Sequence, residues 1–174
     1  MIRNTTVTVC GPLNVNKLGV TYVHEHLMVK PQLPDEYYIP YTLDDEAAST
    51  EETRSFSAAG GETLVEMTPI NYGRNVKAYQ RIAQATGVHV ICCTGFHKQL
   101  FMPPWFGDKT DGELYDILMD EVTNGLDDTE IHPGVIKLGT SFEEVTAAEK
   151  RSIEAVARVH RDTGIPISTH CDKG

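Results

Sequence analysis

Residues 19–26 read Gly-Val-Thr-Tyr-Val-His-Glu-His, a short apolar run that ends in two histidines. Successive side chains of a strand point to opposite faces, so this pattern places His24 and His26 on one face and Glu25 on the other. Two neutral imidazoles so placed can bind one divalent metal ion, and zinc takes histidine nitrogens while keeping a position open in catalytic sites. The alternative is a strand end with two exposed or hydrogen-bonded histidines.

Two later apolar segments also carry a polar residue, one inside a predicted strand and one at a strand end. Residues 134–141 form an apolar run that contains Lys137, and residues 165–170 end in His170. Taken alone, Lys137 is equally compatible with a strand lysine that pairs with a carboxylate or reaches solvent. His170 alone is compatible with a hydrogen-bonded strand-end histidine.

The chain alternates strand and helix patterns, which predicts a parallel sheet packed against helices. After a hairpin at 7–10 and 13–15, the predicted strands are 20–24, 63–67, 88–94, 135–138 and 165–170, and the predicted helices are 44–59, 75–86, 111–125 and 146–163. A long loop is predicted at 29–42. We favour a (β/α)8 TIM-barrel type over a doubly wound fold, because polar residues end several strands and no glycine-rich turn follows an early strand.

Five strands are too few to close such a barrel, which has eight strands and typically ~250 residues. We therefore expect residues 1–174 to form a single domain that is the N-terminal part of a barrel. An open domain completed by a partner chain and a genuine five-stranded domain are the alternatives. Both edge strands of an open sheet would be free to pair with another chain.

Composition excludes several function classes. The 174 residues carry a formal net charge of −10, which argues against binding to nucleic acid or to an anionic membrane surface. The four cysteines form no C-x-x-C pair, so a zinc ribbon is excluded and reduced core cysteines in a cytoplasmic protein are expected.

Four short motifs, taken in order, resemble the phosphotriesterase family of the amidohydrolase superfamily. They are Val-His-Glu-His at 23–26, Thr-Gly-Phe at 94–96, Val-Ile-Lys at 135–137 and Thr-His at 169–170. The resemblance extends over essentially the whole chain. It implies a (β/α)8 barrel with two divalent metal ions at its mouth.

The resemblance also implies ligands for these metals. His24 and His26 would bind the first ion, His170 would bind the second, and Lys137 would bridge both as a catalytic carbamate. Zinc is expected, although manganese, cobalt and iron accept similar ligands. Such metals activate a bridging water to hydrolyse a lactone, a carboxylic ester or a phosphotriester.

Two further ligands of the family follow the sixth and eighth strands, which the five-strand pattern does not contain. We therefore expect the 174-residue chain alone to be weakly active or inactive. An amidase or deaminase of the same superfamily and a non-catalytic binding or assembly module are the alternatives. The expected partners are a small ester-like substrate and either a second copy of the chain or a complementary barrel portion.

Four other residues are candidates for supporting roles. Glu66 ends the second main strand, where it would orient a metal-binding histidine or make a loop contact. Phe96 and His97 follow the third strand and are expected to line the substrate pocket. Arg74 precedes a helix and would meet an anionic substrate group or lie at the surface.

Overall fold

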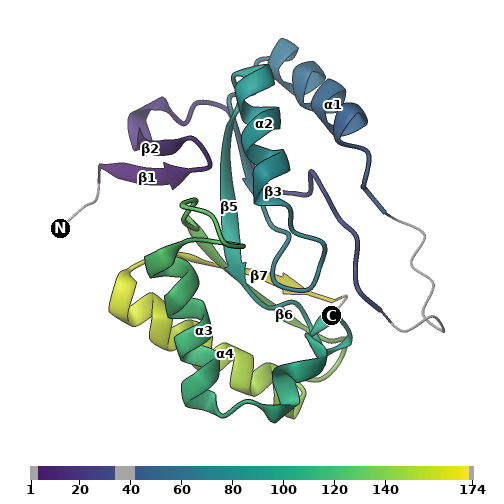
Figure 1. Ribbon diagram of the computed structural model, residues 1–174, viewed down its shortest axis with the longest axis vertical. Coiled ribbons are helices and arrows are strands. Elements are labelled where there is room, and N and C mark those ends of the chain that lie inside the picture. The colour runs from purple at the N-terminus through teal and green to yellow at the C-terminus, as the bar shows by residue number, and fades with distance from the viewer. Residues whose placement is uncertain (1–3, 34–41, 173–174) are drawn as a thin grey trace.

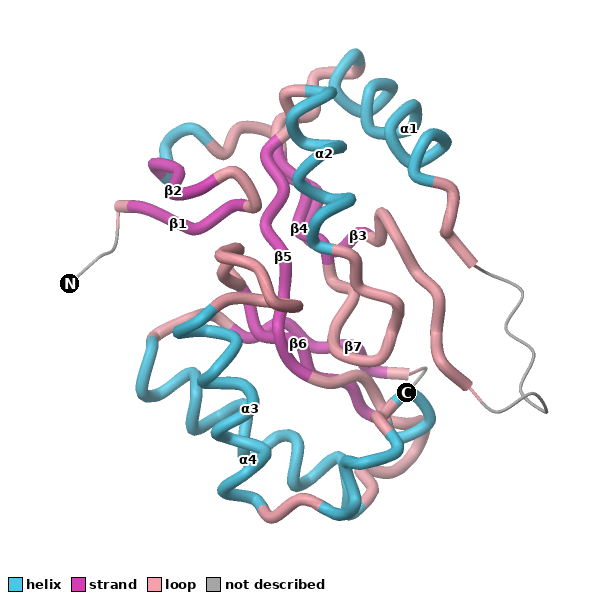
Figure 2. Tube along the Cα trace, viewed as in Figure 1, coloured by secondary structure: helices cyan, strands magenta, loops and turns pink. Residues whose placement is uncertain are grey.

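The structure is a computed structural model, which describes residues 4–33 and 42–172 (Figure 1). Five parallel strands form one sheet in the order β3-β4-β5-β6-β7, as the strand pattern predicts. Their bounds are β3 (Thr21–Glu25), β4 (Thr63–Glu66), β5 (His89–Gly95), β6 (Val135–Thr140) and β7 (Ile167–Cys171). The sheet curls into half of a barrel, and Figure 2 shows β5 running lengthwise while β6 and β7 cross below it.

The predicted hairpin is confirmed as a separate two-stranded antiparallel sheet of β1 (Thr5–Thr8) and β2 (Gly11–Asn14). A short 3-10 helix, η1 (Val15–Lys17), follows it. The Val9 backbone N–H donates to the carbonyl oxygen of Val90 at 2.8 Å, which attaches the hairpin to β5.

All four predicted helices are present, with ends within two residues of the prediction. They are α1 (Glu46–Ala58), α2 (Val76–Thr86), α3 (Asp111–Asn124) and α4 (Ala147–Thr163). Each begins after a side chain that accepts hydrogen bonds from the first turn, namely Asp45, Asn75, Thr110 and Thr146. Two further 3-10 helices, η2 (Gln99–Phe101) and η3 (Pro104–Asp108), connect β5 to α3 and were not predicted.

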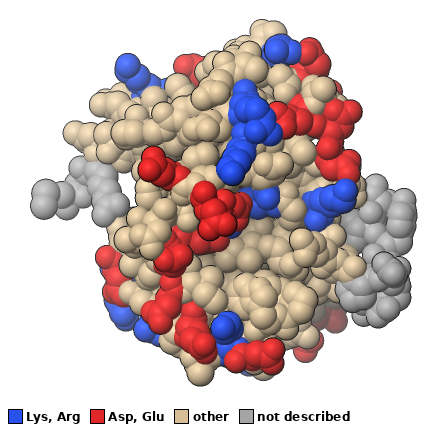
Figure 3. All heavy atoms as spheres, in the orientation of Figure 1, with Lys and Arg blue, Asp and Glu red and all other residues tan. Residues whose placement is uncertain are grey.

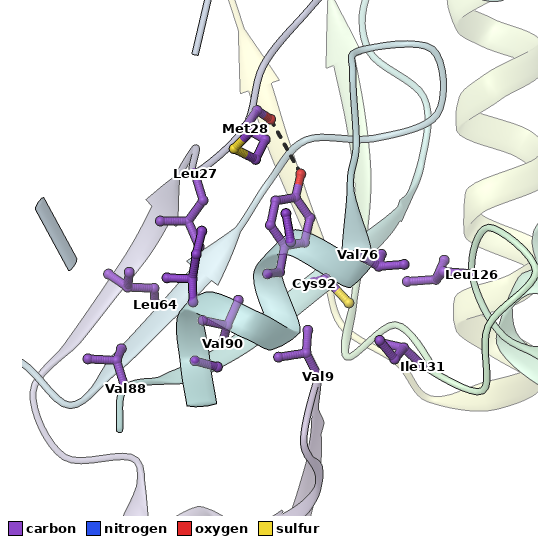
Figure 4. Packing of buried hydrophobic residues seen from close by; sticks show 14 residues of the cluster. Val9, Leu27, Met28, Leu64, Val76, Val88, Val90, Cys92, Leu126 and Ile131 are labelled. Carbon is purple, nitrogen blue, oxygen red and sulfur yellow. Dashed lines mark hydrogen bonds between the residues drawn. The ribbon is translucent and has the colours of Figure 1, made fainter. Parts of the chain in front are cut away.

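Alternate residues of the strands face opposite sides of the curled sheet. Val90 and Cys92 lie under α2, as Figure 4 shows, whereas Ile91 and Cys93 pack in a different cluster. Along β6, Ile136 and Leu138 pack against α3 and α4, and Val135 lies with Ile91 and Cys93. Lys137 therefore belongs to the face that the helices do not cover.

The sheet is open at β3 and β7, its two edges. On and beside β3, the apolar residues Val20, Tyr22 and Val23 are 58%, 53% and 70% exposed. Edge strands present unpaired backbone groups, so these residues border a surface on which further strands can add.

The predicted loop at 29–42 lies partly outside the described residues, which resume at Thr42. Val29 and Leu43 pair in an isolated antiparallel bridge and join the two described ends of this segment. Within the described ranges, no helix combines the length and apolar character needed to cross a membrane. Figure 3 shows acidic side chains interspersed with single basic ones on one face, with no continuous basic surface on its described part.

Candidate functional site

The strand ends bring together the histidines and the lysine that the sequence places on different strands. Lys137 Nζ lies 2.9 Å from His24 Nε2, although 113 residues separate them. The ring centroids of His24 and His26 are 5.5 Å apart, and those of His97 and His170 are 4.6 Å apart. The predicted ligands therefore gather at one end of the sheet, the end of the strand carboxyl termini.

Hydrogen bonds determine which ring nitrogen of His26 carries a proton. Thr68 donates its hydroxyl hydrogen to the Met28 carbonyl oxygen at 3.1 Å, so this hydroxyl can only accept from His26 Nδ1, which lies 2.8 Å away. Nδ1 of His26 consequently carries the hydrogen, and Nε2 keeps its lone pair. Thr68 lies beyond β4 and was not among the sequence candidates.

His24, like His26, has its lone pair on Nε2. A lysine ammonium has no acceptor, so Lys137 Nζ donates to Nε2 of His24, which therefore carries a lone pair. Burial, followed by the positive charges of Lys137 and His170, lowers the pKa of His24 to about 4. Burial and then the charge of Lys137 lower the pKa of His26 to about 3. Both imidazoles are thus neutral near pH 7, the form that binds metals.

Lys137 is the most unusual member of the group. Its side chain is fully buried, and among the described residues it has no carboxylate partner. Burial lowers its pKa to about 8. Neither of the simple alternatives, pairing with a carboxylate or reaching solvent, therefore describes this lysine.

Gly95 controls the position of the Lys137 backbone. Gly95 pairs with Lys137 across β5 and β6 and has φ +111°. A Cβ atom at Gly95 would lie 2.0 Å from the Lys137 carbonyl oxygen, which also accepts from the Phe96 N–H at 3.2 Å. Only glycine allows the two strands to approach this closely.

Glu66 makes the loop contact that was the alternative to orienting a histidine. Its carboxylate accepts from the backbone N–H groups of Leu27 and Thr68, at 2.8 and 2.7 Å. One of its oxygens lies 3.8 Å from His26 Nδ1, beyond hydrogen-bond distance. Burial raises the pKa of Glu66 to about 7, against the opposing effect of the hydrogen bonds from Thr68 and Leu27. Glu66 therefore contacts His26 only indirectly, by binding the backbone of Leu27, the next residue, and of Thr68, whose hydroxyl accepts from His26.

His97 lies beside the cluster, packed between aromatic rings. Its ring centroid is 4.9 Å from that of Tyr72 and 4.7 Å from that of Phe101. The Lys98 N–H donates to His97 Nδ1 at 2.7 Å. Burial, followed by the charges of Lys137 and His170, lowers the pKa of His97 to about 2. His97 is thus a neutral, buried neighbour of His170.

Phe96 belongs to the core and not to a pocket wall, which corrects the expectation from the sequence. It is fully buried, with its ring centroid 5.0 Å from that of Phe106 and 6.2 Å from that of Trp105. The reason is strand alternation, because Phe96 continues the face of β5 that the helices cover.

Arg74 is occupied by protein partners. Its five N–H groups donate to both carboxylate oxygens of Glu121, to both of Asp127 and to the Cys93 carbonyl oxygen. No donor remains for a substrate, so we assign Arg74 to the scaffold. Its partners follow it by 47 and 53 residues, which no local sequence pattern indicates.

Nearly the whole chain matches a known family, since the model of the phosphotriesterase family aligns to residues 4–174. The chain belongs to the phosphotriesterase family. It is 31% identical over 159 residues to a phosphotriesterase homology protein of Escherichia coli (strain K12), and this match covers 91% of the chain and 54% of the relative. It is 31% identical to an N-acetyltaurine hydrolase of Danio rerio, over 97% of the chain and 57% of the relative.

Solved structures agree with this assignment. A crystal structure of a lactonase from Listeria monocytogenes superposes with a TM-score of 0.90 at 31% identity, covering 96% of this chain and 56% of the lactonase. The chain thus spans about half the length of the phosphotriesterase-family relatives it matches. The TIM-barrel type expected from the sequence is confirmed, with five of its strands present in the described residues.

The donor set suits divalent metal only if the lysine takes part. Among the described residues, no three His, Cys, Asp or Glu side chains form a metal-binding group by themselves. His24 and His26 supply Nε2 lone pairs, and Lys137 lies at bonding distance from one of them. A neutral or carboxylated Lys137 would add the third ligand to His24 and His26. With Lys137 in either form, the residues present fit a metal site.

Proposed function

We propose that this chain is the N-terminal part of a metal-dependent hydrolase in which His24, His26, Lys137 and His170 hold two divalent metal ions, zinc foremost. The supporting observation is the buried Lys137, which has His24 as its hydrogen-bond partner and no carboxylate within the described part of the chain. Burial disfavours the ammonium and lowers the pKa of Lys137 to about 8, so the neutral amine is far more accessible than for an exposed lysine.

Lys137 has a chemical route to a bridging anion. The lone pair of the neutral Nζ would form a bond to the carbon of carbon dioxide while one C=O π pair moves to oxygen, and the nitrogen would then lose a proton to water, which leaves a carbamate. The positively charged ammonium, which would repel metal ions, would thus become a negatively charged carbamate with two oxygens that can bind them. His24 and His26 would contribute their Nε2 atoms as further ligands, and Thr68 keeps the His26 ring in that tautomer.

The proposed substrate is an ester-like small molecule, either a lactone, a carboxylic ester or a phosphotriester. When bound, the metal ions would lower the pKa of a water between them and polarise the oxygen of the bond to be cleaved. The likeness to a lactonase favours a lactone. Amide hydrolysis is the second candidate, because one relative is an N-acetyltaurine hydrolase.

We propose that the 174-residue chain on its own binds metal but turns over such substrates weakly or not at all. The family resemblance implies two more ligands after a sixth and an eighth strand, and the sheet of described residues has five strands. The site formed by the chain alone would therefore lack part of the ligand set.

Metal content measured by elemental analysis tests the site. The wild-type chain, purified with zinc and bicarbonate, is expected to retain about two metal ions per chain. The double variant His24→Ala/His26→Ala should lose at least one of them, because two of the four proposed ligands are gone. Lys137→Met should lose both, and a carbamate carbon signal in ¹³C-bicarbonate should disappear with it.

The control is His160→Ala, which alters a histidine that lies on α4 and bonds the Ile165 carbonyl oxygen. This variant is expected to keep the full metal content. Equal metal content in the wild-type chain and in His24→Ala/His26→Ala would refute the proposed site.

We further propose that the exposed edges of the sheet are covered in solution, by a second copy or by a complementary barrel portion. Val20, Tyr22 and Val23 are more than half exposed on and beside β3, and water contact of such side chains is unfavourable. The purified chain should therefore run as a dimer or larger species by light scattering. A compact monomer at every protein concentration would refute the proposal that a second copy covers these edges.

A further inference from the structure

Asp172 is a carboxylate that joins two parts of the site, and neither the sequence pattern nor the proposed metal ligands account for it. Its Oδ1 accepts from His170 Nε2 at 3.0 Å. Its Oδ2 accepts from Lys98 Nζ, which extends from the segment after β5. The two oxygens therefore have separate partners, and the carboxylate connects the ends of β5 and β7.

The hydrogen bond to Asp172 specifies the tautomer of His170. A carboxylate only accepts, so Nε2 of His170 carries a hydrogen, and in the neutral ring Nδ1 holds the lone pair. In residues 4–33 and 42–172, nothing bonds to this Nδ1. Histidines that bind metals commonly donate their other ring N–H to a carboxylate in this way.

Lys98 contacts His97 and Phe101 as well as Asp172. These contacts restrict the Lys98 side chain and so the position of the Asp172 carboxylate. Its backbone N–H donates to His97 Nδ1 at 2.7 Å, and its Nζ lies 5.7 Å from the centre of the Phe101 ring. The side chains of Lys98 and Asp172 are 19% and 27% exposed, so the pair is shielded from water more than an ordinary surface ion pair. The His97 and His170 rings then meet edge to face.

We propose that Asp172, anchored by Lys98, is a positioning residue that holds His170 as its Nε2–H tautomer and presents Nδ1 to the metal. The metal-facing part of this inference rests on the proposed function. The tautomer itself does not, because the hydrogen bonds that set it are formed by the protein alone.

Long-range ¹H–¹⁵N NMR spectra of the metal-free chain test this inference. They are recorded at about pH 8.5, where an ordinary imidazole is neutral. The wild-type chain is expected to show His170 wholly as the Nε2–H tautomer, with a slowly exchanging Nε2 proton. Asp172→Ala should make that proton exchange rapidly and introduce a share of the Nδ1–H form. Asp172→Asn keeps an acceptor oxygen and should preserve the tautomer.

Two other histidines serve as internal controls in the same spectra. His132 and His160 each place Nδ1 on a backbone carbonyl oxygen, at 3.1 and 2.7 Å, so both are Nδ1–H tautomers. Their signals should be unchanged in the Asp172 variants. The His170 signal is assigned by its loss in His170→Gln.

Zinc titration is the second measurement. Loss of the carboxylate is expected to weaken the affinity for the second metal by roughly 10- to 100-fold in Asp172→Ala, with most of it restored in Asp172→Asn. An Nδ1–H tautomer in the wild-type chain, or identical His170 signals in wild type and Asp172→Ala, would overturn the inference. Absence of zinc binding combined with the expected tautomers would instead refute the proposed function and leave the role of Asp172 intact.

Discussion

Gly95→Ala is expected to lower the free energy of unfolding by roughly 3–6 kcal/mol, a large share of the stability of an ordinary domain. Alanine at φ +111° is strained, and its Cβ would lie 2.0 Å from the Lys137 carbonyl oxygen. That oxygen belongs to the backbone of β6, so relief requires the two strands to separate. Urea unfolding followed by circular dichroism measures the change.

Gly11→Ala is the matched control for this change. Gly11 has φ +109°, nearly the same as Gly95, and a Cβ there would meet nothing within 4 Å. Gly11→Ala should therefore lower the free energy of unfolding by about 1–3 kcal/mol, from backbone strain alone. Equal losses of stability in the two variants would show that the contact with Lys137 is unimportant. A larger loss in Gly95→Ala attributes the difference to the approach of β5 and β6.

Arg74→Met is expected to destabilise the chain by about 3–5 kcal/mol, because it removes the cation from a buried ion pair. Methionine keeps much of the side-chain volume, but the Glu121 carboxylate, only 14% exposed, would remain without its partner. Thr94 donates its hydroxyl to the same carboxylate at 2.5 Å and cannot neutralise it. Chemical unfolding of the variant, with the wild type alongside, measures the loss.

Arg81→Met provides the comparison for Arg74→Met. Arg81 also makes two hydrogen bonds to one carboxylate, that of Glu46, but both side chains are well exposed. Its replacement should cost no more than about 1 kcal/mol. In addition, Arg74→Met/Glu121→Gln should recover part of the stability lost in Arg74→Met. Similar losses in Arg74→Met and Arg81→Met would contradict a buried, coupled pair.

Much of the fold could be predicted because it depends on local patterns. The alternation of apolar strands with amphipathic helices predicted every strand of the sheet and all four helices in order. The predicted helix bounds are correct to within two residues, and the structure shows that Asp45 and Thr146 cap the first turns of α1 and α4. The 3-10 helices of the β5–α3 connection were missed, because single turns have no periodic signal.

The candidate site was predicted in part, for the residues whose position follows from strand periodicity. His24 and His170 lie next to the last residues of β3 and β7, and Lys137, inside β6, pairs with the last residue of β5, so the parallel strands bring all three side chains to one region. Phe96 was misplaced because the strand pattern was ended at Thr94, whereas β5 continues to Gly95 and turns the next side chain into the core. Because β5 is one residue longer than predicted, the Phe96 side chain lies in the core and does not line a pocket.

Local sequence patterns were sufficient to predict the order of the elements, the faces of the strands and the proximity of His24, Lys137 and His170. These follow from the backbone's period-two alternation and the parallel connections, which need only local information. Three features became visible only in the folded chain: the partners of Arg74, the tautomer of His26 set by Thr68, and the Asp172–Lys98 pair beside His170. Those contacts join residues about 40 to 75 positions apart, and they depend on how tightly the sheet curls and on the register in which its strands meet.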